Sequence, residues 1–216
     1  DAGRILIQNL IHFRHSFTHV LDAGCGTGST TTALANAIQY ESLLAIDISS
    51  SLLQQAAPLF HTNFKILNFD DIATVNTSFD LIFSNLALHW SPSFSATLDH
   101  LKRALANDGM FAFTIPLQDT FHEMKDICAT NHFMTHDQAI ALLRTAGYQL
   151  HLSYSQSFTT TYPDGLSALR AIKHTGANCV VDRKQKSLTP KSLLSKLDFN
   201  QLSYHIGFFI AGHAHG

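Results

Sequence analysis

Along the chain, short apolar runs alternate with longer stretches in which apolar residues recur at helical spacing. The apolar runs predict buried strands at 18–21, 42–47, 64–67, 79–85 and 110–115. The periodic stretches predict helices at 4–13, 29–38, 50–59, 92–105, 116–131, 136–146 and 166–174. Strands that alternate with helices in this way are typical of a parallel sheet with helices on both faces, an α/β fold.

The last part of the chain has a different pattern. Residues 148–161 alternate polar and apolar side chains, which predicts a strand with one solvated face, and 202–212 read as a closing strand. A turn is expected at Asn107–Gly109, before the strand at 110–115. There is no internal repeat, and no boundary divides the chain clearly. We therefore expect residues 1–216 to form a single domain.

A glycine-rich turn separates the first apolar run from the helix that follows it. Asp22, Gly24, Gly26 and Gly28 form the pattern D-x-G-x-G-x-G. Glycines between a strand and a helix let backbone N–H groups approach a ligand at the carboxyl end of the strand. The dinucleotide fingerprint needs its third glycine where this chain has Ser29, which argues against an NAD(P) oxidoreductase.

With its strand, its acid and its helix in place, this turn resembles the first motif of class I S-adenosylmethionine (SAM) methyltransferases. The resemblance implies a Rossmann-like fold and SAM as the methyl donor. In that fold a seven-stranded, mostly parallel sheet has an antiparallel last strand and helices on both faces.

Asp47 closes the second predicted strand about 19 residues after Gly28, the separation at which an acid meets a ribose in nucleotide-binding α/β folds. A carboxylate can accept from both hydroxyls of a ribose diol. The alternative is that Asp47 caps the helix that follows Ile48. With the glycine motif upstream, we favour the ribose, and we count Ile48 among the cofactor-binding residues.

Two later segments extend the cofactor site. In the class I family, the position of Asp70, Asp71 and Ile72 places an acid near the adenine amino group and an apolar residue against the ring. The alternative is an acidic surface turn. Spacing does not decide between the two acids, although the residue just before Ile72 is favoured. Asn85 and Leu86, at the end of the fourth strand, would border the methionine part of SAM.

Further segments are similar to a narrower family, the malonyl-acyl-carrier-protein O-methyltransferases of biotin synthesis. They lie at 79–90, 166–177, 188–190 and 202–208. The resemblance implies methyl transfer from SAM to the free carboxylate of malonyl-acyl carrier protein or malonyl-CoA. The chain starts at Asp1 without methionine, and the N-terminal segment with which the family helps to cover its substrate is expected to be missing.

This chemistry needs no general base, because a carboxylic acid of this type is already ionised at neutral pH. It does need a cation for the substrate carboxylate. Arg170 offers a bidentate fork, unless it simply lies on a solvated helix face. Lys173 would meet the acidic carrier protein. His89 and Trp90 would line the crevice, whereas the alternative for 79–90 is a plain buried strand with Trp90 in the core.

Composition excludes several other classes of function. The net charge is −2, from 14 Lys and Arg against 16 Asp and Glu, and no basic stripe indicates nucleic acid. No apolar run reaches the length of a membrane span, and no signal peptide is visible. Three scattered cysteines lack disulfide or metal spacing, which fits the cytoplasm.

The 14 histidines do not predict a metal site. His12 with His15, and His132 with His136, have same-face helical spacing, but neither pair has a clear third ligand. Two alternative functions stay open at this point. One is a SAM-dependent O- or C-methyltransferase for a small molecule of another pathway, and the other is a SAM-binding protein without catalysis.

Overall fold

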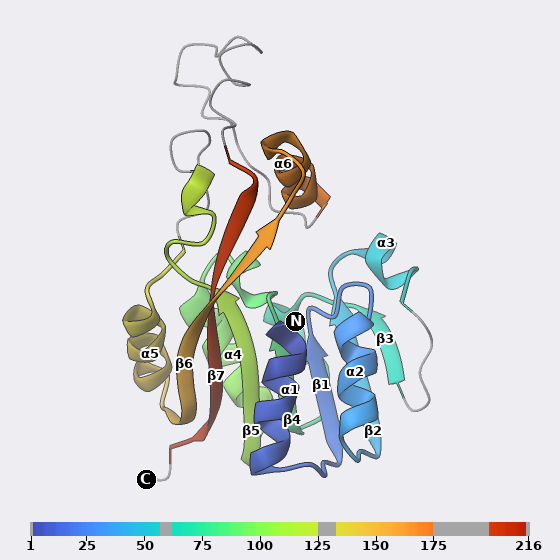
Figure 1. Ribbon diagram of the computed structural model, residues 1–216. Coiled ribbons are helices and arrows are strands. Elements are labelled where there is room, and N and C mark those ends of the chain that lie inside the picture. Colours follow the sequence, from blue (N-terminus) through green and yellow to red (C-terminus); the bar gives the residue numbers. More distant parts are fainter. Residues whose placement is uncertain (1, 57–61, 125–132, 175–198, 215–216) are drawn as a thin grey trace. The chain divides into compact units, whose positions relative to one another are not determined.

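The computed structural model describes residues 2–56, 62–124, 133–174 and 199–214 (Figure 1). The chain divides into two compact units. Unit 1 comprises residues 1–115, 136–155 and 207–216. Unit 2 comprises residues 116–135 and 156–206.

The chain forms a seven-stranded sheet. Its strands are β1 (His19–Ala23), β2 (Ser42–Asp47), β3 (Thr62–Ile66), β4 (Phe79–Asn85), β5 (Leu105–Pro116), β6 (Tyr148–Thr161) and β7 (Gln201–His213). Of β6 and β7, residues 148–155 and 207–213 belong to unit 1. Their order is β3-β2-β1-β4-β5-β7-β6, and β7 runs antiparallel to the other six. The predicted α/β class and the antiparallel last strand are therefore confirmed.

The strand order reverses between β1 and β4. Leu21 of β1 lies opposite Leu44 of β2 on one side and opposite Ile82 of β4 on the other, and both pairings are parallel. Since crossovers between parallel strands are right-handed, the chain places helices on opposite faces as it winds outward in each direction. The carboxyl ends of β1 and β4 thus border the crevice in which such sheets bind ligands.

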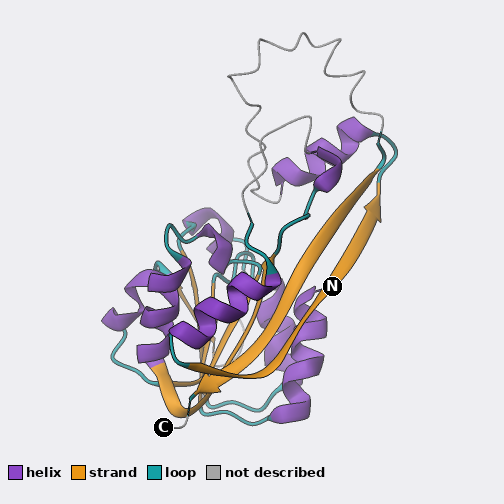
Figure 2. Cartoon of the chain, turned by 90° about the vertical axis from the view of Figure 1, so that its left-hand side faces the viewer, coloured by secondary structure: helices purple, strands orange, loops and turns teal. Residues whose placement is uncertain are grey.

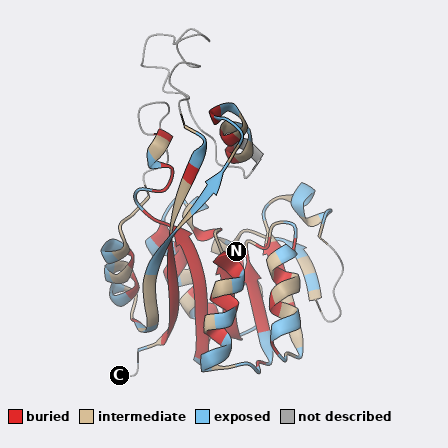
Figure 3. Ribbon diagram, viewed as in Figure 1, coloured by how far each residue is buried: buried red, intermediate tan, exposed pale blue. Residues whose placement is uncertain are grey.

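Helices cover both faces of this sheet (Figure 2). In unit 1 they are α1 (Ala2–Phe13), α2 (Ser29–Ala37), α3 (Ser50–Leu53), α4 (Phe94–Ala104) and α5 (His136–Thr145), with short 3-10 helices η1 (Phe69–Thr74) and η2 (Leu88–Trp90). The central strands are buried as a result (Figure 3). All of 79–84 is buried, which explains its continuous apolar run apart from Asp80 and Ser84.

Local sequence explains where α4 begins and which face it buries. The hydroxyl of Ser93 accepts a hydrogen bond from the Ala96 N–H and caps the helix. Leu98 and Leu101 recur at helical spacing and are fully buried, while Asp99 and Arg103 between and beyond them face solvent. The amphipathic pattern therefore fixes the orientation of the helix on the sheet.

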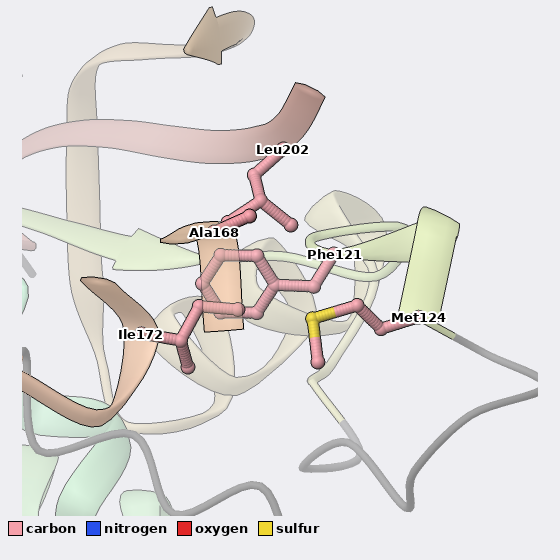
Figure 4. Packing of buried hydrophobic residues seen from close by; sticks show 5 residues of the cluster. All are labelled: Phe121, Met124, Ala168, Ile172 and Leu202. Carbon is pink, nitrogen blue, oxygen red and sulfur yellow. The ribbon is translucent and has the colours of Figure 1, made fainter. Parts of the chain in front are cut away.

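Unit 2 has a small apolar core of its own (Figure 4). Its elements are η3 (His122–Met124), α6 (Gly165–His174) and parts of β6 and β7. The core consists of Phe121, Met124, Ala168, Ile172 and Leu202. The segment before η3 pairs with β7, because the N–H groups of Leu117 and Phe121 donate to the carbonyls of His205 and Ser203.

Three local predictions differ from the structure. The prediction of a helix at 116–131 is wrong for residues 116–124. This segment forms hydrogen bonds to β7, and its only helical element is η3. Residues 125–131 lie outside the described residues. The helix expected at 50–59 ends at Leu53, and 57–59 are not described. The turn at Asn107–Gly109 lies within β5, where the register with β4 shifts between Phe79 and Leu81.

Candidate functional site

The glycine turn between β1 and α2 has three residues in the left-handed region of backbone conformation. The φ angles are +81° at Gly24, +56° at Gly26 and +77° at Gly28. Two N–H groups, those of Gly24 and Cys25, donate to the carbonyl of Ile46 at 2.8 and 3.0 Å. The turn is thus tied to the end of β2, and only glycine adopts this run of conformations without strain.

The three glycines are required for different reasons. A Cβ atom on Gly24 would lie 2.2 Å from the Cβ of Ala87, so this glycine allows the turn after β4 to pack closely. A Cβ on Gly28 would lie 3.2 Å from the Cβ of Ala56. At Gly26 a Cβ would meet nothing within 4 Å. Of the three, Gly26 therefore borders open space that a ligand can enter.

Asp47 joins this turn to the segment after β2. Its Oδ2 accepts a hydrogen bond from the Gly26 N–H at 2.8 Å, and its Oδ1 accepts one from the Ser49 N–H at 2.9 Å. Ser49 itself caps α3, so the alternative role of Asp47 as the helix cap is wrong. A carboxylate has further acceptor capacity beyond two bonds. Beside it, Ile48 is 72% exposed.

Asp22 lies beneath the turn with only 1% of its surface exposed. The Thr31 hydroxyl donates to its Oδ2 at 2.6 Å. The pKa of Asp22 is raised to about 7, chiefly by burial; the bond from Thr31 opposes this rise, and the nearby charge of Asp47 adds to it. Asp22 therefore supports the start of α2 through Thr31 and presents almost no surface to a ligand.

The two acids of η1 differ in their surroundings. The Oδ1 of Asp70 accepts a hydrogen bond from the Thr97 hydroxyl of α4 and lies 3.9 Å from Nδ1 of His100. Asp71 is exposed, and its carboxylate makes no hydrogen bond or ion pair with the described residues. Ile72 is fully buried. The structure thus ties Asp70 to α4 and leaves Asp71 as the accessible acid.

The turn after β4 is held from several sides. The Thr114 hydroxyl donates to Oδ1 of Asn85 at 2.8 Å, and Nδ2 of Asn85 lies 3.5 Å from Oγ1 of Thr30. Leu86 has φ +54°, a conformation rare for a residue with a branched side chain. Such strain is kept only where the surrounding structure enforces it, and it is common at ligand sites.

His89 and Trp90 follow in η2 with their ring centroids 4.8 Å apart. Burial lowers the pKa of His89 to about 4, so its imidazole is neutral at pH 7. Trp90 is 48% exposed, and the alternative that placed it in the core is wrong. These two residues lie just beyond the carboxyl end of β4, and their lining role stays a prediction.

Arg170 and Lys173 lie in α6 of unit 2. The helix is anchored through Ala168 and Ile172 in the apolar core of this unit (Figure 4). Arg170 is exposed. The carboxylate of Asp164 accepts from the Ser167 N–H at 2.7 Å at the start of α6. The side chain of Lys173 lies outside the described part of the structure.

Neither a metal cluster nor a membrane span is found among the described residues. No group of three His, Cys, Asp or Glu side chains in these parts of the chain is arranged to hold a metal ion. None of the described helices is long and apolar enough to cross a membrane.

The fold, the glycine turn and the acid that closes β2 define a class I methyltransferase domain. A family model described as "Methyltransferase domain" matches residues 20–109. The fold is shared with the N-methyltransferase NodS from Bradyrhizobium japonicum, solved in complex with S-adenosyl-L-homocysteine. The two chains are 12% identical, with a TM-score of 0.63 and coverage of 98% of this chain and 86% of that one.

Curated relatives narrow this class. Malonyl-acyl-carrier-protein O-methyltransferase 2 of Coxiella burnetii is 35% identical over 95% of this chain and 84% of its own length. The malonyl-acyl-carrier-protein O-methyltransferase of Erwinia billingiae is 32% identical over 90% of this chain and 78% of its own. The chain belongs to the malonyl-acyl-carrier-protein O-methyltransferase family. It is a SAM-dependent methyltransferase.

The residues at the carboxyl ends of β1, β2 and β4 fit SAM. Gly26 borders open space, the carboxylate of Asp47 lies beside it with acceptor capacity left, and the apolar side chain of Ile48 is exposed. Sequence reasoning did not single out Thr31 and Thr114, which hold Asp22 and Asn85. A threonine inside an apolar strand, as in 111–115, is the signal that points to Thr114.

Proposed function

We propose that this enzyme transfers the methyl group of SAM to the free carboxylate of malonyl-acyl carrier protein, or of malonyl-CoA, in biotin synthesis. The observation that carries this proposal is the extent of the match. The general methyltransferase model matches only 20–109. The Coxiella relative aligns with 95% of the chain, and the match therefore extends into the part after residue 109 that includes α6 and Arg170. We place the reaction in the cytoplasm, in keeping with the scattered cysteines.

The donor is assigned to the carboxyl ends of β1, β2 and β4. Asp47 accepts from the ribose hydroxyls, with its orientation already set by the N–H groups of Gly26 and Ser49. Asp71, the accessible acid of η1, accepts from the adenine amino group, between Ile48 and the segment of Ile72. Asn85 and Leu86 border the methionine part, and Asp22, Gly24 and Gly28 shape the turn beneath it.

SAM, when bound, supplies a methyl group on a sulfonium that an oxygen nucleophile attacks directly. A malonyl carboxylate has a pKa of roughly 3 to 4, so the nucleophile is present at neutral pH without a general base. The residues therefore need only to align the carboxylate oxygen with the methyl group and to exclude water. Neutral His89 and Trp90 serve as walls of this space and introduce no charge.

Arg170 is proposed to hold the substrate carboxylate. Its guanidinium offers two parallel N–H donors that match a carboxylate. Buried His89 is uncharged at pH 7 and cannot supply the positive charge, whereas Arg170 is always charged and lies on the exposed face of α6. Lys173, farther along the same helix, is assigned to the acidic carrier protein, a contact that weakens with salt.

A panel of acceptors tests the proposal. Malonyl and acetyl thioesters of carrier protein and of coenzyme A, together with unrelated acids, phenols and amines, are each incubated with labelled SAM and the enzyme. The proposal expects labelling of the malonyl thioesters and none of the acetyl ones, because only the malonyl group has a free carboxylate. Rapid labelling of a different small molecule, with no labelling of the malonyl group, would favour another pathway. No labelling despite SAM binding would indicate a non-catalytic protein.

A further inference from the structure

Thr114 is a buried polar residue in the apolar part of β5, beside the end of β4. Its hydroxyl donates to Oδ1 of Asn85 at 2.8 Å and accepts a hydrogen bond from the Leu86 N–H at 3.1 Å. The same N–H also lies 3.1 Å from the Thr114 carbonyl. One side chain therefore contacts both residues that border the proposed methionine end of the donor.

These bonds determine how the Asn85 amide is turned. A hydroxyl has a single proton, and here that proton goes to Oδ1 of Asn85 while a lone pair of the oxygen receives the Leu86 N–H. The opposite side of the amide, Nδ2, is then directed toward Oγ1 of Thr30 in the first turn of α2. Thr114 thus specifies which side of the amide faces the glycine turn.

Close packing around the same amide limits its movement. A Cβ atom on Gly3 of α1 would lie 3.1 Å from Cγ and Nδ2 of Asn85 and 2.6 Å from Cγ2 of Thr30. On the other side, Ala87 packs directly against Gly24. The turn after β4 is therefore enclosed by α1, α2 and the glycine turn, and Thr114 supplies its polar support from β5.

We propose that Thr114 is a positioning residue for methyl transfer, acting through Asn85 to present the turn after β4 to the methyl donor. The proposal rests on the placement of the donor given under the proposed function. It assigns no chemical step to Thr114, because the side chain is fully buried and both of its hydrogen-bonding functions are used within the protein.

Replacement of Thr114 by valine separates this role from a general contribution to stability. Valine has the same shape but no hydroxyl, and the Leu86 N–H keeps the backbone carbonyl of residue 114 as a partner. We expect Thr114→Val to raise the dissociation constant for SAM about tenfold, the effect of losing about one well-placed hydrogen bond, and to lower kcat while KM for the carrier substrate is unchanged. Thr114→Ser, which keeps the hydroxyl, should stay within about twofold of wild type.

Tyr148→Phe is a matched control. It also removes a buried hydroxyl from unit 1, one that donates to the Leu98 carbonyl at 2.9 Å, but it has no bond to the turn after β4. We expect this variant to lose thermal stability and to retain wild-type SAM affinity. Titration calorimetry and thermal unfolding are measured on all variants, below the lowest unfolding temperature.

A double-mutant cycle with Asn85→Ala tests whether Thr114 acts through Asn85. If it does, the double variant binds SAM no more than about twofold more weakly than Asn85→Ala alone. Full additivity, or wild-type affinity and kcat in Thr114→Val, overturns the proposal. Should the valine variant not fold, Thr114→Ala is judged by the same criteria. Failure of the wild-type protein to bind SAM would instead refute the placement of the donor.

Discussion

Gly26 and Gly24 offer a matched pair of substitutions two residues apart in the same turn. Both have positive φ, so an alanine at either position costs about 1 to 2 kcal/mol in backbone strain. At Gly24 the new methyl would also meet Ala87 at 2.2 Å. Such overpacking costs typically about 1 to 3 kcal/mol more. At Gly26 the methyl would project into open space.

The two variants should therefore lose different properties. We expect Gly26→Ala to stay folded, with its unfolding temperature lowered by about 2 to 4 °C for each kcal/mol of strain. Its SAM affinity should fall at least about tenfold, or about 1.4 kcal/mol, because the methyl occupies space that the donor needs. Gly24→Ala should be the less stable of the two, since it carries the steric clash in addition to the strain.

Calorimetric titration with SAM and thermal unfolding of the unliganded proteins measure these effects. Alanine is preferred to valine at position 26, because a β-branched residue adds strain of its own at positive φ. Wild-type affinity in folded Gly26→Ala would refute the reasoning, since the open space beside Gly26 would then not be part of the donor site. Equal stability of the two variants would refute the role of Gly24 in packing.

Three further predictions concern charged residues. Asp47→Ala should weaken SAM binding by about 1 to 3 kcal/mol in calorimetry through the loss of charge-assisted hydrogen bonds, and unchanged affinity would contradict the ribose assignment. Arg170→Ala should lower kcat/KM at least ~10²-fold with SAM affinity nearly unchanged, and Arg170→Lys should recover only part of the lost kcat/KM. Normal kinetics in the alanine variant would exclude Arg170 as the residue that holds the substrate carboxylate. Burial is the main reason that the pKa of Asp22 is raised from 3.8 to about 7, so the folded protein binds this proton more tightly than the unfolded chain does. The free energy of unfolding of wild type, relative to that of Asp22→Asn, should therefore fall as the pH rises from about 4 to about 7. Denaturant unfolding at several pH values checks this, and a constant difference would contradict it.

The pattern of apolar residues predicts the bounds of a strand correctly where burial alone determines them. The strands at 42–47, 79–85 and 148–161 have the predicted bounds, since a buried run or a strict alternation ends where polar turn residues begin. The helix predicted at 116–131 is wrong over its described part because burial alone does not determine this segment. Its apolar residues at 117 and 121 suit a helix, but their N–H groups pair with β7, a partner about 85 residues away that no local pattern reveals.

The same limit applies to the candidate site. Spacing located Asp47 at the tip of β2, but it could not show that the carboxylate orients the glycine turn through the Gly26 N–H. Nor could spacing separate Asp70 from Asp71, because the difference is a hydrogen bond to Thr97 on a helix far along the chain. Sequence patterns thus indicate which residue types lie at the strand ends, whereas tertiary contacts decide which of two adjacent acids is hydrogen-bonded within the protein and which is accessible.

The most direct test of the account is a single reaction of malonyl-acyl carrier protein, methyl-labelled SAM and this enzyme, followed by intact-mass measurement of the carrier. The account predicts a carrier heavier by one methylene, with the label released by mild alkali as methanol, as expected for a methyl ester and not for cleavage of the thioester alone. Because the nucleophile is an ionised carboxylate, the reaction should proceed at neutral pH, and a rate that rises only below about pH 5 would contradict this chemistry. An unlabelled malonyl carrier, or a label that resists alkali, would contradict carboxyl methylation.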